Sequence, residues 1–146
     1  MCRNELRTRF AVATGNFGNV LAGYYARRMG LPIERLVIGC NENDILHRLF
    51  SSGCYHREGV TPTISPSMDI EISSNLERYF YYLADEDPAR VKRWMNDFKA
   101  SGKLTLTPEE LARAQQDFGS GRASQEQVRS ATELDGCSNH NPTKHS

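Results

Sequence analysis

Two short apolar runs flank a segment with helical periodicity near the start of the chain. Residues 9–13 and 35–40 each read as a strand, since they are mostly apolar and too short for a helix. Between them, Val20 and Tyr24 stand at i,i+4 spacing on one side of a predicted helix, which Gly30 ends. Strand, helix and strand in this order predict a βαβ unit with parallel strands and a right-handed crossover.

Helix start signals recur along the rest of the chain. Asn43 or Asp44 is expected to cap a helix over 45–50 that ends near Gly53, and a loop follows over 55–69. The later signals are a capping box at 74–77 before a helix over 76–84, Asp87-Pro88 before a helix that contains 91–98, Thr107-Pro108 before a helix over 111–118, and Ser124 before one more. The sequence therefore predicts a largely helical part after the βαβ unit.

Composition and charge limit what the chain can be. Its 146 residues suffice for one domain, and 18 basic against 18 acidic residues indicate no surface for nucleic acid or an anionic membrane. No apolar stretch approaches the ~18 residues that span a bilayer, and the N-terminus has no apolar signal region. Four widely spaced cysteines suit free thiols in a reducing compartment. We therefore expect a soluble, cytoplasmic chain with no nucleic-acid or membrane partner.

The end of the chain differs in composition from the rest. The glycines of 119–121 are expected to break the chain, and 135–146 has Cys137 as its only apolar residue. Such a segment cannot bury enough surface to offset the entropy of ordering its backbone. We divide the sequence into a folded part, 1–122, and a divergent, disordered tail, 123–146.

The turn over 14–19 carries the most distinctive chemistry of the sequence. It reads Thr-Gly-Asn-Phe-Gly-Asn, and Gly15 and Gly18 lack a Cβ, so they can take positive φ and let the backbone approach a ligand closely. The helix expected from Val20 would direct unpaired N–H groups and its positive dipole end into the turn, which suits a phosphate monoester. The G-x-x-G spacing matches neither the dinucleotide fingerprint nor the Walker motif, so an ordinary glycine loop remains the alternative.

Other polar side chains allow functional and structural interpretations alike. His47 is either a residue near a substrate phosphate or a partly packed helix histidine. Arg48, Arg57 and Arg78 could bind an oxyanion, but they equally suit a solvated surface. The constrained Ser-Pro-Ser-Met-Asp-Ile turn at 65–70 could line a pocket, although its chemistry identifies no role.

Two groupings of cysteine and histidine resemble halves of a metal site. They are Cys54 with His56, and Cys137 with His140 and His145. Zinc requires four ligands and a layer of supporting partners, which neither a loop pair nor three residues of a polar tail supplies. We predict no metal site.

Four stretches of the sequence together resemble the threonine synthase family. They are the turn at 13–19, Leu-Ala-Gly-Tyr-Tyr and Met-Gly-Leu-Pro-Ile within 21–33, Asn-Glu-Asn-Asp-Ile-Leu-His-Arg at 41–48, and Ser-Pro-Ser-Met-Asp-Ile with Ser-Ser-Asn-Leu-Glu-Arg within 65–78. The resemblance covers 7–121 and is strongest up to Arg78. It implies an α/β chain, a partial three-layer parallel-sheet domain of the type II pyridoxal-phosphate fold (as in the tryptophan synthase β chain) with a helical C-terminal part.

The same resemblance implies an activity and a cofactor. The family is a pyridoxal 5'-phosphate-dependent lyase of threonine biosynthesis, which converts O-phospho-L-homoserine and water to L-threonine and phosphate. The loop that holds its cofactor phosphate corresponds to Gly15, Asn16, Phe17, Gly18 and Asn19. This assignment agrees with the chemistry of the turn, where several backbone N–H groups would meet a dianion.

The sequence departs from the family at the catalytic lysine. The family's lysine for the cofactor lies well upstream of the glycine loop, in a segment not found here, and this chain's lysines are Lys92, Lys99, Lys103 and Lys144. The family also continues beyond the point where this tail turns polar. We therefore assign no catalytic residue and expect an internal fragment that is inactive alone.

Two alternatives to an inactive fragment stay open. One is a phosphate-ligand-binding or regulatory module that uses the glycine loop without covalent chemistry. The other is one part of a split enzyme, in which another polypeptide supplies the lysine and the remainder of the site. In every case an isolated βαβ unit would expose both sheet edges, so we expect the chain alone to be marginally folded or aggregation-prone.

Overall fold

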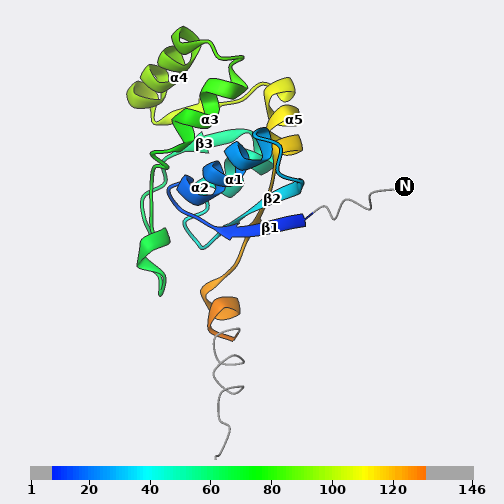
Figure 1. Ribbon diagram of the computed structural model, residues 1–146. Helices are drawn as coiled ribbons and strands as arrows, with labels where there is room; N and C mark the ends of the chain where they lie inside the picture. Colours follow the sequence, from blue (N-terminus) through cyan, green and yellow to red (C-terminus); the bar gives the residue numbers. More distant parts are fainter. Residues whose placement is uncertain (1–7, 131–146) are drawn as a thin grey trace, which may run out of the picture.

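A three-stranded parallel sheet forms the base of the fold in the computed structural model, which describes residues 8–130 (Figure 1). The strands are β1 (Thr8–Ala13), β2 (Ile33–Cys40) and β5 (Phe118–Arg122), in the order β1-β2-β5. Helix α1 (Gly18–Arg28) connects β1 to β2 and packs against the sheet. The predicted βαβ unit and the α/β class with a parallel sheet are confirmed.

Strand β5 is the main difference from the expected fold. The glycines of 119–121 predict a break in the chain, and this prediction is wrong, because these residues pair in parallel with β2. Leu36 lies opposite Phe118, and Phe118 is only 1% exposed. Two glycines give a strand little propensity of its own, so the pairing and the buried ring of Phe118 hold it in place.

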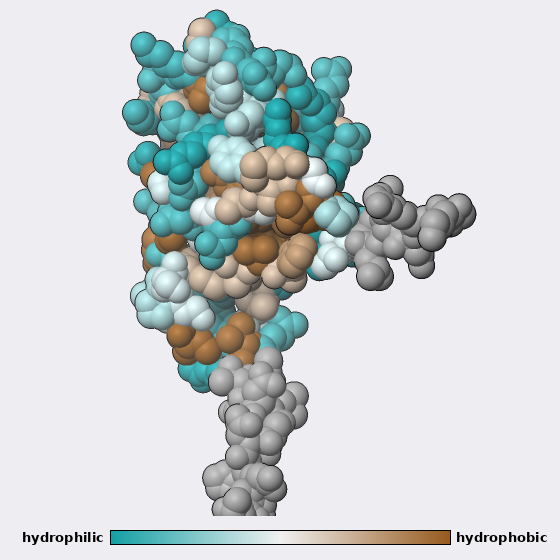
Figure 2. All heavy atoms as spheres, viewed as in Figure 1, coloured by the Kyte–Doolittle hydropathy of each residue, from teal (hydrophilic) through white to brown (hydrophobic). Residues whose placement is uncertain are grey.

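One edge of the sheet is exposed. All residues of β1 except the half-buried Val12 are exposed, and the side chain of Phe10 is 47% exposed. Figure 2 shows apolar surface over this part of the molecule. Since β5 covers the outer edge of β2, the expectation that the βαβ unit exposes both edges is wrong for β2 and holds for β1 within the described residues.

Helix α2 and a small second sheet follow the βαβ unit. Helix α2 (Ile45–Ser52) ends at Gly53, whose φ of 77° is left-handed, as the sequence predicts. Strand β3 (Cys54–His56) pairs antiparallel with β4 (Lys103–Thr105). Both strands were absent from the predicted elements, because runs of three residues are too short to show a periodic pattern.

The later helices form a layer beyond the sheet (Figure 1). They are α3 (Leu76–Leu83), α4 (Pro88–Ser101) and α5 (Pro108–Asp117), and a short 3-10 helix, η1 (Pro66–Met68), precedes them. The Asp87 carboxylate accepts from the N–H groups of Ala89 and Arg90 and so caps α4. Thr107 begins α5 in a capping box with the third helical residue, so both predicted helix starts are confirmed.

The start of the expected tail is helical. Residues 125–130 form a helix, and Ser124 and Gln127 bond reciprocally as in a capping box. The helix expected after Ser124 is therefore present, and the disordered tail over 123–146 stays a prediction. Residues 131–146, with the expected disorder of 135–146, lie outside the described residues.

Aromatic rings form the centre of the core. The rings of Tyr24, Phe50, Tyr79 and Phe118 pack around or beside that of Phe17, with centroids 5.0 to 6.0 Å apart between neighbours. Each of these side chains is at most 7% exposed. Because the rings come from α1, α2, α3, β5 and the turn before α1, the cluster joins the sheet to the helical layer. Within residues 8–130, no helix is long and apolar enough to cross a membrane.

Candidate functional site

The turn over 14–19 lies at the carboxyl end of β1, where the chain enters α1. The N–H of Thr14 donates to the carbonyl of Gly39 at 3.2 Å and ties the start of the turn to the end of β2. In open parallel sheets, ligands bind outside the carboxyl ends of the strands. The turn therefore lies where a ligand site is expected in this class of fold.

Phe17 carries the left-handed conformation of the turn, with φ 63° and ψ 6°. Gly15 and Gly18 do not use the positive φ that is open to glycine: within the described residues, the glycines in that region are Gly30, Gly53, Gly59 and Gly102. A left-handed non-glycine residue costs about 1–2 kcal/mol. The fully buried ring of Phe17 offsets this cost, and it places the Phe17 side chain in the core, away from any ligand.

Gly15 is needed because other residues pack closely against it, and not because of its φ angle. A Cβ on Gly15 would lie 2.8 Å from Cδ1 of Ile70 and 3.2 Å from Cα of Met68, which is too close for a side chain. A Cβ on Gly18 would lie 3.4 Å from Nδ2 of Asn75, an ordinary contact. Gly15 therefore lets the turn pack directly against the segment that contains η1.

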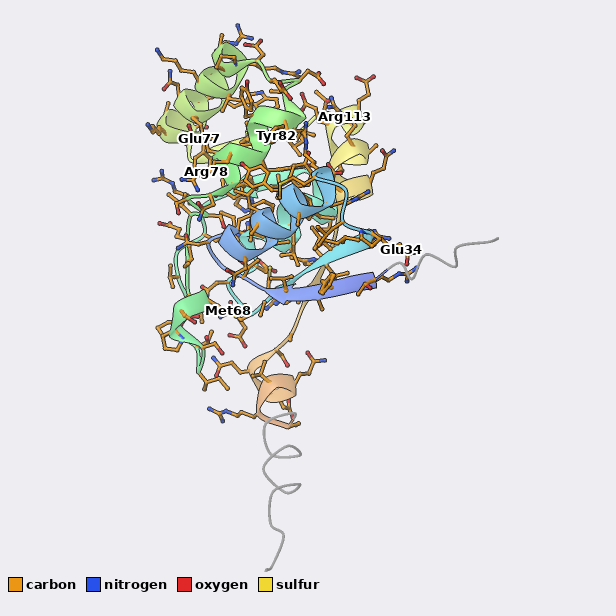
Figure 3. The ribbon with its side chains drawn as sticks, in the orientation of Figure 1. Glu34, Met68, Glu77, Arg78, Tyr82 and Arg113 are labelled. Atoms are coloured by element: carbon orange, nitrogen blue, oxygen red, sulfur yellow. The ribbon has the colours of Figure 1, made fainter. Side chains whose placement is uncertain are left out.

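A shallow pocket of about 250 Å³ lies between the turn and η1. Its lining residues are Ala13, Thr14, Gly15, Asn16, Gly18, Asn19, Ser67 and Met68. Four of the predicted cofactor-binding residues thus share one pocket, and Phe17 is the one that does not line it. Figure 3 shows Met68 on the η1 segment, at the end of the molecule away from α4 and α5.

Helix α1 begins at this pocket, earlier than the predicted Val20. Its first backbone bond runs from the N–H of Leu21 to the carbonyl of Phe17 at 3.0 Å, and no described side chain caps the helix. The N–H groups of Gly18 and Asn19 precede that bond, so they have no intrahelical acceptor. They and the positive end of the helix dipole would meet an anion in the pocket.

The segment before α3 supports the turn from behind. The hydroxyl of Ser73 donates to the carbonyl of Gly15, and the side-chain amide of Asn75 donates to the carbonyl of Asn16 at 3.0 Å. The hydroxyl of Ser74 donates to the side-chain oxygen of Asn16 at 3.2 Å. The predicted capping box at 74–77 is therefore wrong: Asn75 is the N-cap of α3, no described side chain caps that helix, and the Ser74 hydroxyl bonds to the turn.

The two asparagines of the turn are used differently. The side-chain oxygen of Asn16 faces Ser74, whereas Asn19 is exposed on the first turn of α1 beside the pocket. Asn19 is thus the side-chain amide of the turn that remains free to turn toward a ligand in the pocket.

Asp69 fixes a second loop against the carboxyl end of β2. Its Oδ1 accepts from Nδ2 of Asn41 at 2.7 Å, from Nδ2 of Asn43 at 3.0 Å and from the hydroxyl of Thr63 at 2.7 Å. Its Oδ2 accepts from the N–H of Thr63 at 2.7 Å. These bonds, that of the Thr63 hydroxyl above all, lower the pKa of Asp69 below its ordinary value of 3.8. The role that the sequence left open for 65–70 is thus to hold this loop beside the pocket.

Arg48 is engaged in ion pairs. Its Nε lies 2.9 Å from Oδ1 of Asp44, and its guanidinium contacts Oε1 of Glu58 at 3.0 Å. Asp44 also pairs with Arg122 at 3.2 Å, which joins the start of α2 to β5. The structure therefore favours the structural interpretation of Arg48.

The other two arginines also contact protein groups. Arg78, on α3 (Figure 3), donates to the side-chain oxygen of Asn75 at 2.7 Å. The guanidinium of Arg57 lies 5.2 Å from the ring centroid of Phe98. Neither lines the pocket at the turn.

His47 connects α2 to β5. Its Nδ1 lies 2.9 Å from Oγ of Ser120, and the side chain is half-buried. This contact supports the interpretation of His47 as a packed helix histidine. Its partner could not be named from the sequence, because the glycine-flanked Ser120 carried no strand signal.

Cys54 and His56, the first suggested pair of metal ligands, are in contact, but no third ligand joins them within the described residues. Sγ of Cys54 lies 3.3 Å from Nδ1 of His56. Across 8–130, no group of three His, Cys, Asp or Glu side chains is placed to hold a metal ion. Cys137, His140 and His145 lie outside the described residues.

Sequence and structure comparisons both lead to one family. The chain is 48% identical to the threonine synthase of Schizosaccharomyces pombe over an alignment that covers 82% of the chain, and 45% identical to that of Pseudomonas aeruginosa. The crystal structure of the pyridoxal-phosphate-bound threonine synthase of Brucella melitensis matches 92% of the chain, with a TM-score of 0.84 and 41% identity. This chain is homologous to a segment of threonine synthase. No protein-family model matches the sequence.

The homologous segment is a minor part of each threonine synthase. The chain covers 27% of the S. pombe protein, 25% of the P. aeruginosa protein and 30% of the B. melitensis structure. The yeast threonine synthase structure matches 82% of the chain, with a TM-score of 0.76 and 45% identity, and 26% of it is covered. The chain thus spans about a quarter of the length of the curated relatives it matches. The expected type II pyridoxal-phosphate fold is confirmed for this segment.

Several residues around the pocket at the turn were not singled out from the sequence. They are Asn41 and Asn43, which bind Asp69, and Ser73 and Asn75, which bind the turn. The asparagines follow directly after β2, and polar side chains at the carboxyl end of a parallel strand are a detectable signal. The contacts of Ser73 and Asn75 join segments far apart in sequence, and no local pattern predicts them.

Proposed function

We propose that this chain is the part of a pyridoxal-phosphate-dependent threonine synthase that holds the cofactor phosphate. The whole enzyme converts O-phospho-L-homoserine and water to L-threonine and phosphate. One observation carries the proposal: the uncapped N-terminus of α1 opens onto a pocket in a chain whose relatives are threonine synthases. We also propose the cytoplasm as its compartment, because its cysteines are widely spaced.

The residues at the pocket fit a phosphate ester. Gly15 has no side chain, so the backbone of the turn packs closely against Ile70 and Met68 at the pocket. Main-chain N–H groups at a helix N-terminus are a recurrent site for phosphate. A pocket of about 250 Å³ is smaller than the roughly 300–1,000 Å³ of complete ligand sites, which suits one end of a cofactor.

Each residue of the turn has a distinct part in binding. The N–H groups of Gly18 and Asn19 would donate to the phosphate, and the side-chain amide of Asn19 could turn toward it. Ser73 and Asn75 hold the carbonyl oxygens of Gly15 and Asn16 by hydrogen bonds, so these partial negative charges are kept from the dianion. Bound pyridoxal phosphate supplies an electron-withdrawing ring that stabilises negative charge on a substrate carbon.

In this proposal, the lysine that binds the cofactor covalently lies on a part of the enzyme outside this chain. Lys92 and Lys99 line a separate groove between α3 and α4, and Lys103 lies on β4. None of these lysines lines the pocket at the turn. We infer that the rest of the enzyme supplies the lysine and the facing wall of the site, and that this chain alone is inactive.

A chimeric enzyme tests the function directly. Residues 8–122 of this chain replace the homologous segment of the S. pombe threonine synthase, and phosphate and threonine formation from O-phospho-L-homoserine are measured. The chimera is expected to be active. The same chimera with Gly15→Val is expected to lose at least about tenfold in activity, because the new side chain would clash with Ile70 and Met68 and displace the turn, and each phosphate donor moved out of place costs about 1–3 kcal/mol. The control is Gly121→Ala, where a Cβ meets nothing within 4 Å. A folded chimera without activity would contradict the proposal.

Ligand binding by the chain itself tests the phosphate site. Pyridoxamine phosphate is the probe, because it carries the phosphate but has no aldehyde to react with surface lysines. Dialysis is expected to show saturable binding that pyridoxamine, without the phosphate, does not show. Gly15→Val is expected to abolish the binding. Binding of both compounds alike would rule out a phosphate site at this turn.

A further inference from the structure

Cys54, His56 and Glu58 form a row of reactive groups apart from the pocket at the turn. Cys54 and His56 alternate along β3 with the buried Tyr55, so both side chains lie on the face of the strand opposite Tyr55. Sγ of Cys54 lies 3.3 Å from Nδ1 of His56, and Nε2 of His56 contacts Oε1 of Glu58. Thiol, imidazole and carboxylate in this order are the arrangement that activates a cysteine nucleophile.

The carboxylate of Glu58 sets the tautomer of His56. An ionised carboxylate can only accept, so Nε2 carries the proton and donates it to Glu58. Nδ1 then has a lone pair directed toward the thiol of Cys54, and it can take the thiol proton. The guanidinium of Arg48 can only donate, and it lies 3.0 Å from Oε1 of Glu58, 2.7 Å from Nε2 of His56 and 3.0 Å from Nδ1. Arg48 therefore fixes the row to α2 and shares the Nδ1 lone pair with the thiol of Cys54.

The charges around the row come from both neighbouring elements. On the α2 side, the charge of Arg48 is paired with Asp44 at 2.9 Å. On β4, Lys103 lies opposite His56 and the neutral Thr105 lies opposite Cys54. Two cations, Arg48 and Lys103, and two carboxylates, Asp44 and Glu58, therefore lie on the elements next to the histidine.

We propose that Cys54 is a nucleophilic thiol, with His56 as its base, that forms mixed disulfides with low-molecular-weight disulfides such as glutathione disulfide. The thiol proton passes to Nδ1 of His56, and Sγ of Cys54 attacks one sulfur of the disulfide. The disulfide bond breaks, and the departing thiolate takes the proton from His56. Cys54 is oxidised and the reagent is reduced to one equivalent of free thiol. The reaction uses none of the residues proposed to hold the cofactor phosphate.

Cys40 provides an internal reference for this reactivity. It is 5% exposed, and burial raises the pKa of its thiol to about 11. Cys54 is half-buried and keeps contact with its base. Of the two cysteines within 8–130, Cys54 is therefore the one expected to react in the folded chain.

The test uses the full chain with Cys2→Ser and Cys137→Ser, which leaves Cys40 and Cys54. Dithiobisnitrobenzoate at pH 7 is expected to modify one thiol rapidly, and Cys54→Ser is expected to remove that phase. An unassisted thiol is only a few per cent ionised at pH 7, so His56→Ala is expected to slow the reaction about tenfold. Added imidazole is expected to restore part of the rate in His56→Ala. The control is Arg57→Gln, whose side chain contacts Phe98 and not the row.

Two results would overturn the proposal. The first is a folded His56→Ala variant, with unchanged circular dichroism, that reacts as fast as its parent. The second is the failure of glutathione disulfide to add one glutathionyl group to Cys54, as read by mass spectrometry of the intact chain and its peptides. A reaction rate that imidazole leaves unchanged in His56→Ala would also count against a base at this position.

Discussion

The ring of Phe17 stacks on the ring of Phe50, with the centroids 5.8 Å apart and the planes within 10°. Phe17 is also the left-handed residue that bends the chain from β1 into α1. The core therefore fixes the shape of the turn through the ring of Phe17. Hydrogen bonds from Ser73 and Asn75 hold the backbone of the turn as well. A rigid turn keeps its N–H groups aimed at one place, which is the requirement for binding an anion without rearrangement.

Phe17→Ala is expected to destabilise the chain by about 3–5 kcal/mol, the usual cost of removing a buried phenylalanine ring. Phe10→Ala removes the same atoms from a position that is 47% exposed, and is expected to cost much less. Unfolding in urea, followed by circular dichroism, measures both. Equal losses in the two variants would show that the ring cluster does not carry the fold.

Tyr55→Phe is expected to loosen the segment behind the turn. The hydroxyl of Tyr55 accepts from the N–H of Ser73 at 2.9 Å, and burial raises the pKa of this tyrosine to about 12. Removal of the hydroxyl leaves a buried N–H unpaired, at a cost of about 1–3 kcal/mol. Hydrogen exchange at the Ser73 amide is expected to accelerate. Tyr81→Phe, at an exposed position, is the control and is expected to leave that amide unchanged.

Asp69→Asn is expected to change how stability depends on pH. Hydrogen bonds hold the pKa of folded Asp69 below 3.8, so its contribution is present above that pH and is lost as the pH falls through the lower folded value. The variant is expected to be less stable than the parent at pH 7, and the difference is expected to shrink below about pH 4. Thermal unfolding from pH 7 to pH 3 measures this. Asp97→Asn, on the exposed side of α4, is expected to give no such convergence.

Glu110→Ala is expected to destabilise the chain by about 2 kcal/mol, because one side chain serves two bonds. Its Oε2 accepts from the N–H of Thr107 at 2.8 Å, and its Oε1 pairs with Arg90 of α4. Glu109→Ala removes a carboxylate from the same helical turn at an exposed position, and a change within about 0.5 kcal/mol is expected. Similar denaturation midpoints for both variants would contradict the role assigned to Glu110.

Local signals in the sequence predicted the helices and the first two strands well. Asp87-Pro88 and Thr107-Pro108 begin helices as expected, since a cap and a proline act within one turn. The βαβ unit followed from two apolar runs on either side of one helix. The turn at 14–19 could be predicted for the same reason, because glycines between a strand and a helix are a local signal for an anion site.

Contacts between distant segments account for most of what the sequence did not predict. Ser74 looked like a helix cap because Glu77 follows it, yet its hydroxyl bonds to Asn16. Gly15 looked like a residue needed for its φ, and it is needed because Ile70 and Met68 pack against it. In each case the partner comes from a segment more than fifty residues away, where a single sequence offers no pattern to follow.

Strand β5 joins the sheet beside β2, although α2 to α5 separate the two in the chain. During synthesis, β1, α1 and β2 leave the ribosome long before Phe118. Until Phe118 follows, one edge of β2 has no partner strand and the ring cluster lacks the ring of Phe118. Pairing of Leu36 with Phe118 then completes the sheet and the core together. Contacts of such long sequence separation slow folding, so the last step of assembly is also the one most exposed to aggregation.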